Sequence, residues 1–346
     1  MKLFVVSAIA GLVISLAGLT LAHEENKDRK YGEKIERVMT VDAQATVTLC
    51  VASGTLTVHG WDKNEVRVRS ADAAQLDFRR VDKMKDASKP ASRVDVMVFN
   101  KKAPGDPRLD CQAIADVEME VPASATVQVQ TRDGDITITG VAGAYAGSQN
   151  GDITIERATK IVEAGSVGGS ILLKDSSGRV SLSSAGGGVE VVNVRAGTSD
   201  DTFEVGTVSG DIHLEGISNP KVMAKTVNGT VMMTGPLVKA GYYGFTNMTG
   251  DVVLALPSDA SFQLNAKVSK KQDIVSDFKL TYLSEAPPAP PAGAKPRSPE
   301  NPPQPPSVER RVVVPYVLRR VNAVCGTGDA TIAVESFGGT IRIKKI

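Results

Sequence analysis

The chain has 346 residues, with 40 Lys and Arg against 39 Asp and Glu. Lys2 is the only charged residue among the first 22, so the remainder carries 39 charges of each sign, which argues against a general nucleic-acid or anionic-membrane binder. Aromatic residues make up only 4%, whereas Val, Ile, Thr and Gly are abundant. This composition favours strands joined by glycine turns over helices, in one large β domain or two.

Residues 1–22 have the layout of a secretory signal peptide: Lys2, a long apolar run, and the small residues Thr20 and Ala22 before the expected cut. The uncharged stretch from Leu3 to Ala22 is also long enough to span a bilayer, so an uncleaved anchor is the alternative. Both outcomes predict an exported protein that is periplasmic, on the cell surface or secreted. It would contact a membrane only through a retained signal.

Residues 23–39 are charged and only weakly periodic, and we interpret them as a tether. Residues 40–130 are expected to form an N-terminal β region. Within it, residues 54–70 alternate apolar and polar side chains on both sides of a polar turn at Asp62–Asn64, which predicts a hairpin. The polar, Lys-rich stretch 72–92 is expected to form a loop.

Residues 131–346 repeat one pattern, a glycine followed by alternating apolar and polar residues. The leading glycines from Gly134 to Gly250 are 17 to 22 residues apart, and such a period indicates stacked repeats. A second, weaker strand lies between them, as at 144–148 and 162–166. A single coil cannot bury its apolar face alone, so neighbouring coils are expected to stack and share one interior. The glycine-led segments begin at Gly134, Gly151, Gly169, Gly188, Gly210, Gly229, Gly250, Gly328 and Gly339.

The leading glycines are expected at sharp corners, where glycine adopts a positive φ without a steric penalty. A following Asp is expected to hydrogen-bond the turn backbone. These aspartates form no continuous acidic column, because Ser170, Val189 and Thr230 stand at equivalent positions. Residues 286–306 contain ten prolines, which lack the N–H that a strand ladder needs, so we interpret them as an exposed insertion at a corner.

Several segments resemble the bacterial putative-adhesin domain family. They are GTLTVHGWDKNEVRVRS at Gly54–Ser70, the segment Val117–Gly140, the later SGDIHLEG, NGTVMMTG and TGDVVLALP units, and the closing GTGDATIAVESFGGTIRI. The resemblance covers about Thr40–Ile346. It implies an all-β, stacked-strand β-solenoid or β-helix-like domain preceded by a small β-hairpin region, exposed at the surface or in the periplasm. It supplies no catalytic residue, and the Pro-rich insertion departs from its pattern.

Cysteines and histidines offer little material for chemistry. Cys50 and Cys111 both lie in the part without repeats and could pair in an oxidising compartment, with buried free thiols as the alternative. The cysteine spacings match no zinc motif, and so few histidines support neither a catalytic triad nor a histidine zinc site. We therefore predict no catalytic residue, metal or cofactor. The remaining residues of these two types are Cys325, His23, His59 and His213.

One cluster of aromatic residues, Tyr242, Tyr243 and Phe245, stands out in a chain that is poor in them. Exposed aromatics on a β surface can stack on sugars or anchor protein partners. The alternative is that alternate aromatics fill the interior of a coil.

These observations predict a non-enzymatic exported β-solenoid that presents a surface for adhesion or for interaction with a cell-envelope protein. Its partner would be a protein or glycan at the cell envelope. One alternative is an envelope sensor or regulatory partner of a membrane protein. Another is a polysaccharide-active β-helix enzyme, which would need several carboxylates converging in a concave site.

Overall fold

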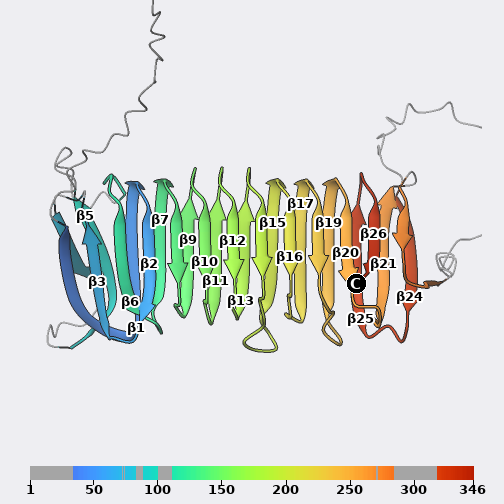
Figure 1. The fold of residues 1–346 in the computed structure, drawn as a ribbon, viewed down its shortest axis with the longest axis horizontal. Coiled ribbons are helices and arrows are strands. Elements are labelled where there is room, and N and C mark those ends of the chain that lie inside the picture. The colour runs from blue at the N-terminus through green and yellow to red at the C-terminus, as the bar shows by residue number, and fades with distance from the viewer. Residues whose placement is uncertain are drawn as a thin grey trace, which may run out of the picture.

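The computed structural model describes residues 34–71, 73, 75–82, 89–99, 111–269, 272–283 and 318–346. These residues form 26 strands and no helix, joined in one continuous sheet. The strands stack along a single axis, with the N-terminal strands at one end and the C-terminal strands at the other (Figure 1). The prediction of an all-β solenoid is confirmed. No helix among the described residues is long and apolar enough to cross a membrane.

The strands form two walls of the solenoid, which we name sheet A and sheet B. The first strand of the chain, β1 (Ile35–Ser53), pairs with strands of both walls and so joins them. In spatial order, sheet A contains β3 (Glu65–Ser70), β6 (Val117–Pro122), β2 (Leu56–Trp61), β8 (Ile136–Thr139), β10 (Ile153–Glu156), β12 (Ile171–Lys174), β14 (Val189–Val192), β16 (Ile212–Glu215), β18 (Val231–Thr234), β20 (Val252–Leu256), β26 (Ile341–Lys345) and β22 (Ile274–Ser276). Sheet B contains β4 (Gln75–Arg80), β5 (Ala91–Phe99), β1 (Ile35–Ser53), β7 (Thr126–Asp133), β9 (Gly143–Ser148), β11 (Ile161–Ser166), β13 (Arg179–Ser184), β15 (Thr202–Ser209), β17 (Lys221–Asn228), β19 (Tyr242–Thr249), β25 (Ala330–Ser336), β21 (Phe262–Ser269), β24 (Leu318–Cys325) and β23 (Thr281–Tyr282).

We call a sheet B strand together with the sheet A strand that follows it in the chain a rung. The described residues form eleven such rungs, and neighbouring rungs pair in parallel. Rung order departs from chain order at both ends of the solenoid. The β1/β2 rung lies between β5/β6 and β7/β8, and the β25/β26 rung lies between β19/β20 and β21/β22. Both ends are closed by antiparallel strands: β3 and β4 at one end, and β24 at the other.

The N-terminal region differs from its prediction in three ways. The chain at 54–70 forms β2 and β3, but these do not pair as a hairpin, because β6 lies between them. The expected loop at 72–92 contains β4, which forms an antiparallel hairpin with β5. The expected tether at 23–39 overlaps β1, which begins at Ile35 and pairs with β3 through residues 35–40. In the first and third cases the partner strand is distant in the sequence, whereas β4 pairs with the next strand of the chain.

Residues 23–33 of the tether, the signal peptide at 1–22 and the Pro-rich insertion at 286–306 lie outside the described residues.

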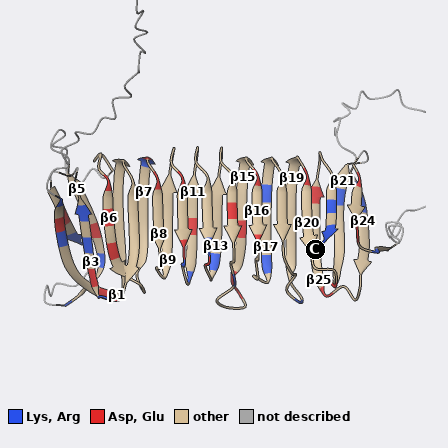
Figure 2. Ribbon diagram, in the orientation of Figure 1, with Lys and Arg blue, Asp and Glu red and all other residues tan. Residues whose placement is uncertain are grey.

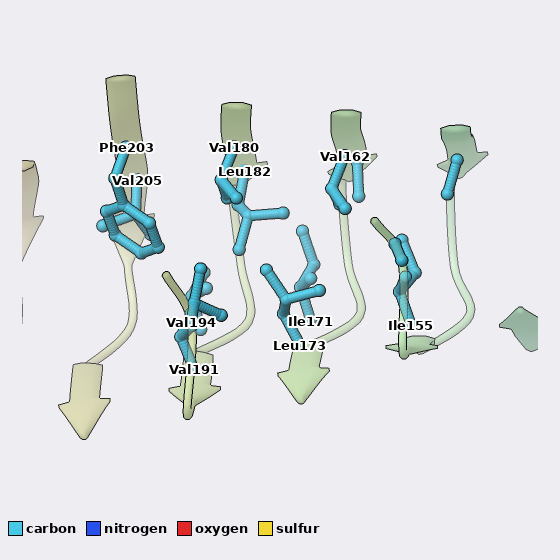
Figure 3. Close-up of a cluster of buried hydrophobic side chains, with 14 of the residues drawn as sticks. Ile155, Val162, Ile171, Leu173, Val180, Leu182, Val191, Val194, Phe203 and Val205 are labelled. Atoms are coloured by element: carbon cyan, nitrogen blue, oxygen red, sulfur yellow. The ribbon is translucent and has the colours of Figure 1, made fainter. Parts of the chain in front are cut away.

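The core fills the space between the two sheets. Side chains from sheet B strands, such as Val180, Leu182 and Phe203, face those of sheet A, such as Ile171 and Leu173 (Figure 3). All of these side chains are buried, at 2% exposure or less. The strict register keeps equivalent apolar residues adjacent in successive rungs, as in the row Ile136, Ile153, Ile171, Val189, Ile212, Val231 and Val252. The shared interior predicted from the repeats is therefore present.

A column of glycines marks the corner where sheet B turns into sheet A in nine of the eleven rungs. A Cβ on Gly151 would lie 1.8 Å from the carbonyl oxygen of Gly134, and one on Gly169 would lie 2.1 Å from that of Gly151. We expected a positive φ to require glycine at the corner, but several of these glycines have none. The feature that all of them share is the close approach of the neighbouring rung, which leaves no space for a Cβ. The glycine column consists of Gly54, Gly134, Gly151, Gly169, Gly187, Gly210, Gly229, Gly250 and Gly339.

Two of the glycine assignments made from the sequence are wrong. In the rung of β14 the leading glycine is Gly187, and Gly188 is equivalent to the residue that follows it in other rungs. Gly328 precedes β25, which belongs to sheet B, so this segment is not a glycine-led strand of sheet A.

Candidate functional site

The aspartates that follow the glycine column link neighbouring rungs. The backbone N–H of Asp152 donates to Oδ1 of Asp135 over 2.9 Å, and that of Ser170 donates to Oδ1 of Asp152 over 2.7 Å. Asp211 and Asp251 accept equivalent bonds from the next rung. These carboxylates bond the adjacent coil rather than their own turn. Ser170, Gly188 and Thr230 interrupt the column, so no continuous acidic row forms.

A buried polar side chain lies three residues before each glycine of the column from Gly134 onwards. Ser184 shows its role: Oγ donates to the carbonyl of Gly169 over 2.9 Å and accepts the N–H of Gly187 over 3.0 Å. The side chain thereby satisfies two backbone groups that would otherwise be unpaired inside the corner. The sequence analysis missed this feature, although the spacing to the glycine is constant. The polar column consists of Thr131, Ser148, Ser166, Ser184, Thr207, Thr226, Asn247 and Ser336.

The outer face of sheet B carries a cleft of about 320 Å³ across β7, β9, β11 and β13. Register places Tyr145 and Glu163 next to each other in one outward column, and Gly147 and Gly165 in the next. Because the two glycines have no side chains, the surface is hollowed beside Tyr145. We name this hollow the sheet B cleft, and its polar lining residues are Gln128, Gln130, Tyr145, Glu163, Ser181 and Ser183.

Near the same corner, an exposed apolar side chain stands two residues before each column glycine from Gly169 to Gly250. Val167 is 60% exposed, Val208 49% and Met248 45%. In chain order, the members stand on successive rungs. We name this set the corner row, and it consists of Val167, Ala185, Val208, Val227 and Met248.

The outer face of sheet A carries a second cleft of about 410 Å³, where Gly188 interrupts the aspartate column. Three carboxylates and one imidazole line it, those of Asp152, Glu190, Asp211 and His213. Glu190 and His213 are direct neighbours in the strand register. Asp152 and Asp211 stand three rungs apart, which is about 14 Å at the usual strand spacing.

The family model named Toastrack DUF4097 matches residues 32–281, more than half of the chain. This chain belongs to the Toastrack DUF4097 family. The family match confirms the expected resemblance to a putative-adhesin domain family, and the strands confirm the β-solenoid-like fold.

Three solved structures are similar to this Toastrack chain. A putative cell adhesion protein from Clostridium sporogenes is 9% identical, with 91% of this chain and 100% of that chain covered and a TM-score of 0.19. A putative adhesin from Parabacteroides distasonis is 12% identical, with 65% and 91% covered and a TM-score of 0.40. A putative lipid binding protein from the same species is 14% identical, with 65% and 90% covered and a TM-score of 0.35. No curated protein matches the chain in sequence.

The three aromatics singled out in the sequence are separated by the Toastrack fold. Strand alternation turns Tyr243 and Phe245 into the core, where they are at most 1% exposed, so they cannot contact a partner. Burial raises the pKa of the Tyr243 phenol, and its hydroxyl accepts the N–H of Val238 over 2.6 Å. Tyr242 is 40% exposed on the outside of sheet B. The interior alternative therefore holds for two of the three residues.

Cys50 of the Toastrack domain forms a disulfide with Cys111, and their Cα atoms are 4.8 Å apart. The bond ties β1 to the segment that leads into β6, at the N-terminal end of the solenoid. Cys325 is a buried free thiol, and burial raises its pKa.

The described histidines of the Toastrack domain, His59 and His213, are both exposed on the outside of sheet A, as their strand positions predict. Within the described ranges, no group of three or more His, Cys, Asp or Glu side chains could hold a metal ion. Acidic and basic residues are interspersed along the row of strands (Figure 2).

Proposed function

We propose that this Toastrack protein is an exported, non-enzymatic binding protein that uses the outside of its solenoid for adhesion or for contact with a cell-envelope protein. The register of the rungs supports this proposal, because it repeats each outward position in a straight column along the axis. A partner can therefore make several equivalent contacts at once, and multivalent contact raises the overall affinity without requiring strong individual sites.

The corner row is the observation that carries the proposal. Five apolar side chains stand exposed on successive rungs, whereas the aspartates and most of the polar column beside them bond the backbone of the fold. Contiguous exposed apolar side chains on a soluble protein mark surfaces that contact a partner. The row contains no charged side chain, so we assign it to a protein partner at the envelope.

The test is capture of a partner by the purified chain from the envelope fraction of its own cells, followed by mass spectrometry. A Val208→Asp, Val227→Asp double variant places two charges in the corner row. Its matched control, Ser209→Asp, Asn228→Asp, places the same charges one residue away on the same two rungs. The proposal expects one defined partner that the wild type and the control retain and the corner-row variant loses. Equal capture by all three proteins, or no partner at all, would contradict it.

The identity of the captured partner separates two versions of the proposal. A surface-displayed or secreted partner supports adhesion, whereas a protein of the inner membrane supports a sensor or regulatory role.

A polysaccharide-active enzyme is the second candidate, and the sheet A cleft is the feature that favours it. Its support is weaker, because Asp152 and Asp211 each accept a backbone N–H of the neighbouring rung, so both carboxylates already bond the fold. Within the described residues, Glu190 is the one carboxylate of this cleft without such a bond. Release of reducing sugar from cell-wall or extracellular polysaccharide, abolished by Glu190→Gln, would support the enzyme over the binding protein.

A further inference from the structure

The sheet B cleft is built from side chains that have no bonding role in the fold. Within the described part of the chain, none of its six polar lining side chains takes part in a hydrogen bond or an ion pair. Similar outward residues elsewhere are paired, as Lys267 is with Glu335 on β21 and β25. The cleft thus offers amide, hydroxyl, phenol and carboxylate groups that bond nothing else in the fold. One wall is formed by Gln128, Tyr145, Glu163 and Ser181, and the two ends are formed by Gln130 and Ser183.

The floor of the cleft consists of backbone. A Cβ on Gly147 would meet only Cγ of Gln130, at 3.7 Å, and one on Gly165 would meet Oγ of Ser183 at 3.4 Å. A Cβ would fit the fold at both positions, so packing does not require glycine here, in contrast to the glycine column. Their absence leaves a hollow that a flat ring can enter beside the Tyr145 side chain.

The lining excludes several classes of ligand. Glu163 is its only charged residue and it contains no Lys or Arg, so an anionic polymer such as nucleic acid is not matched. A peptide cannot add as a further strand, because β9 and β11 already pair on both edges. The polar lining also disfavours an apolar ligand. With five neutral polar side chains against one carboxylate, the lining favours a neutral ligand rich in hydroxyl groups.

The direction of the cleft indicates the shape of that ligand. The hollow runs along the solenoid axis, across strands that lie about 4.8 Å apart. In an extended β-linked chain, each pyranose ring advances by about one such spacing. Successive sugars can therefore meet successive rungs, with hydroxyl groups bonding the Gln128 and Gln130 amides and a ring face stacking on Tyr145.

We propose that the sheet B cleft binds a neutral, extended β-linked pyranose chain that lies along the solenoid axis. This site is separate from the corner row and requires no protein partner. The proposal goes beyond the proposed function, because it assigns a ligand class to a specific surface.

The experiment measures binding of cellohexaose and hexa-N-acetylchitohexaose, both neutral, to the full chain by isothermal titration calorimetry. Maltohexaose, whose α-linked chain is curved, is the control ligand. Binding of at least one β-linked hexamer, with at least about tenfold weaker binding of maltohexaose, is expected. Tyr145→Ala should weaken binding by up to about tenfold, the equivalent of losing one aromatic stacking contact.

Gly147→Val fills the cleft, whereas Gly206→Val makes the same change in the same outward column beyond its end, where the nearest atom to a Cβ is the Lys225 carbonyl oxygen at 3.8 Å. The first variant should abolish binding and the second should retain it. The proposal is overturned if neither β-linked hexamer binds, or if Gly147→Val and Tyr145→Ala both bind as the wild type does. Equal denaturation midpoints of the variants exclude unfolding as the cause, and Tyr145→Ala keeps the test decisive if Gly147→Val does not fold.

Discussion

Replacing Gly187 by alanine tests the close approach that fixes the spacing of the rungs. The new Cβ would lie 2.2 Å from the carbonyl oxygen of Gly169, 2.4 Å from its carbon and 2.7 Å from the nitrogen of Ser170. All three atoms belong to the backbone of the neighbouring rung, so no side chain can rotate to relieve the contact. The two rungs must separate locally, and ladder bonds such as the 3.0 Å contact from Ile171 N–H to the Gly188 carbonyl must lengthen.

The expected loss is about 3 kcal/mol of unfolding free energy, at the upper end of the range for overpacking, because backbone rather than side chain must move. Gly206→Ala is the matched control. Its Cβ would have no neighbour closer than 3.8 Å, and neither glycine has a positive φ, so the control isolates packing from backbone conformation. The control should be neutral or stabilising by up to about 1 kcal/mol, since alanine restricts the unfolded chain.

Urea denaturation followed by far-UV circular dichroism measures both variants. A solenoid of rungs that contact only their neighbours can unfold in stages, so the comparison uses the complete curves as well as the midpoints. Coincident curves for Gly187→Ala and Gly206→Ala would refute the reasoning, because the rung contact would then tolerate a methyl group.

Three other predictions concern bonds that hold the rungs. Ser184→Ala leaves two buried backbone groups at the corner unpaired and should lower the unfolding free energy by about 2 kcal/mol in urea denaturation, whereas a comparable midpoint to wild type would exclude this role. Reduction of the Cys50–Cys111 disulfide, which spans 61 residues, should cost about 4 kcal/mol in the chain-entropy model, and a Cys111→Ser variant should show the same loss and no response to reductant. The pKa of Asp133 lies below its usual value, mainly because the Asn150 amide bonds the carboxylate and secondly because the Arg132 guanidinium does. The ionised carboxylate therefore stabilises the fold above the unfolded pKa of about 3.9, and this stabilisation disappears as pH falls through the folded pKa. Asn150→Ala should raise the pKa of Asp133 in an NMR titration, and an unchanged value would show that the amide has no such effect.

The interior could be predicted from the sequence because strand alternation is a local property. Val127, Val129, Ile136 and Ile138 each alternate with polar residues in the sequence, and all four are fully buried. Each residue's face depends only on its neighbours in the chain, so a short window contains the necessary information.

The order of rungs could not be predicted, because it depends on pairing between distant segments. Leu56 pairs with Ile136 on one side and with Val117 on the other, and nothing in the local pattern of β2 specifies either partner. The same applies to β25 and β26, which enter the stack beside β19 and β20 rather than after β21 and β22.

The error at Gly188 has a more local cause. Three consecutive glycines, Gly186 to Gly188, leave the leading position ambiguous when only the glycine and its alternating strand are considered. Ser184 resolves it, because the buried hydroxyl stands three residues before Gly187, as Ser166 does before Gly169. A pattern that included the polar column would have placed the register correctly.

The repeat also indicates where binding chemistry can lie. Positions that recur in most rungs, namely the leading glycine, the following aspartate and the polar residue three positions before the glycine, bond or contact the neighbouring rung. A ligand group at any of them would compete with the fold. Outward strand positions carry no such duty, so they can vary without loss of register. Gly147 and Gly165 stand at such positions without a packing requirement, and this contrast with Gly151 and Gly169 connects the sheet B cleft to binding rather than to stability.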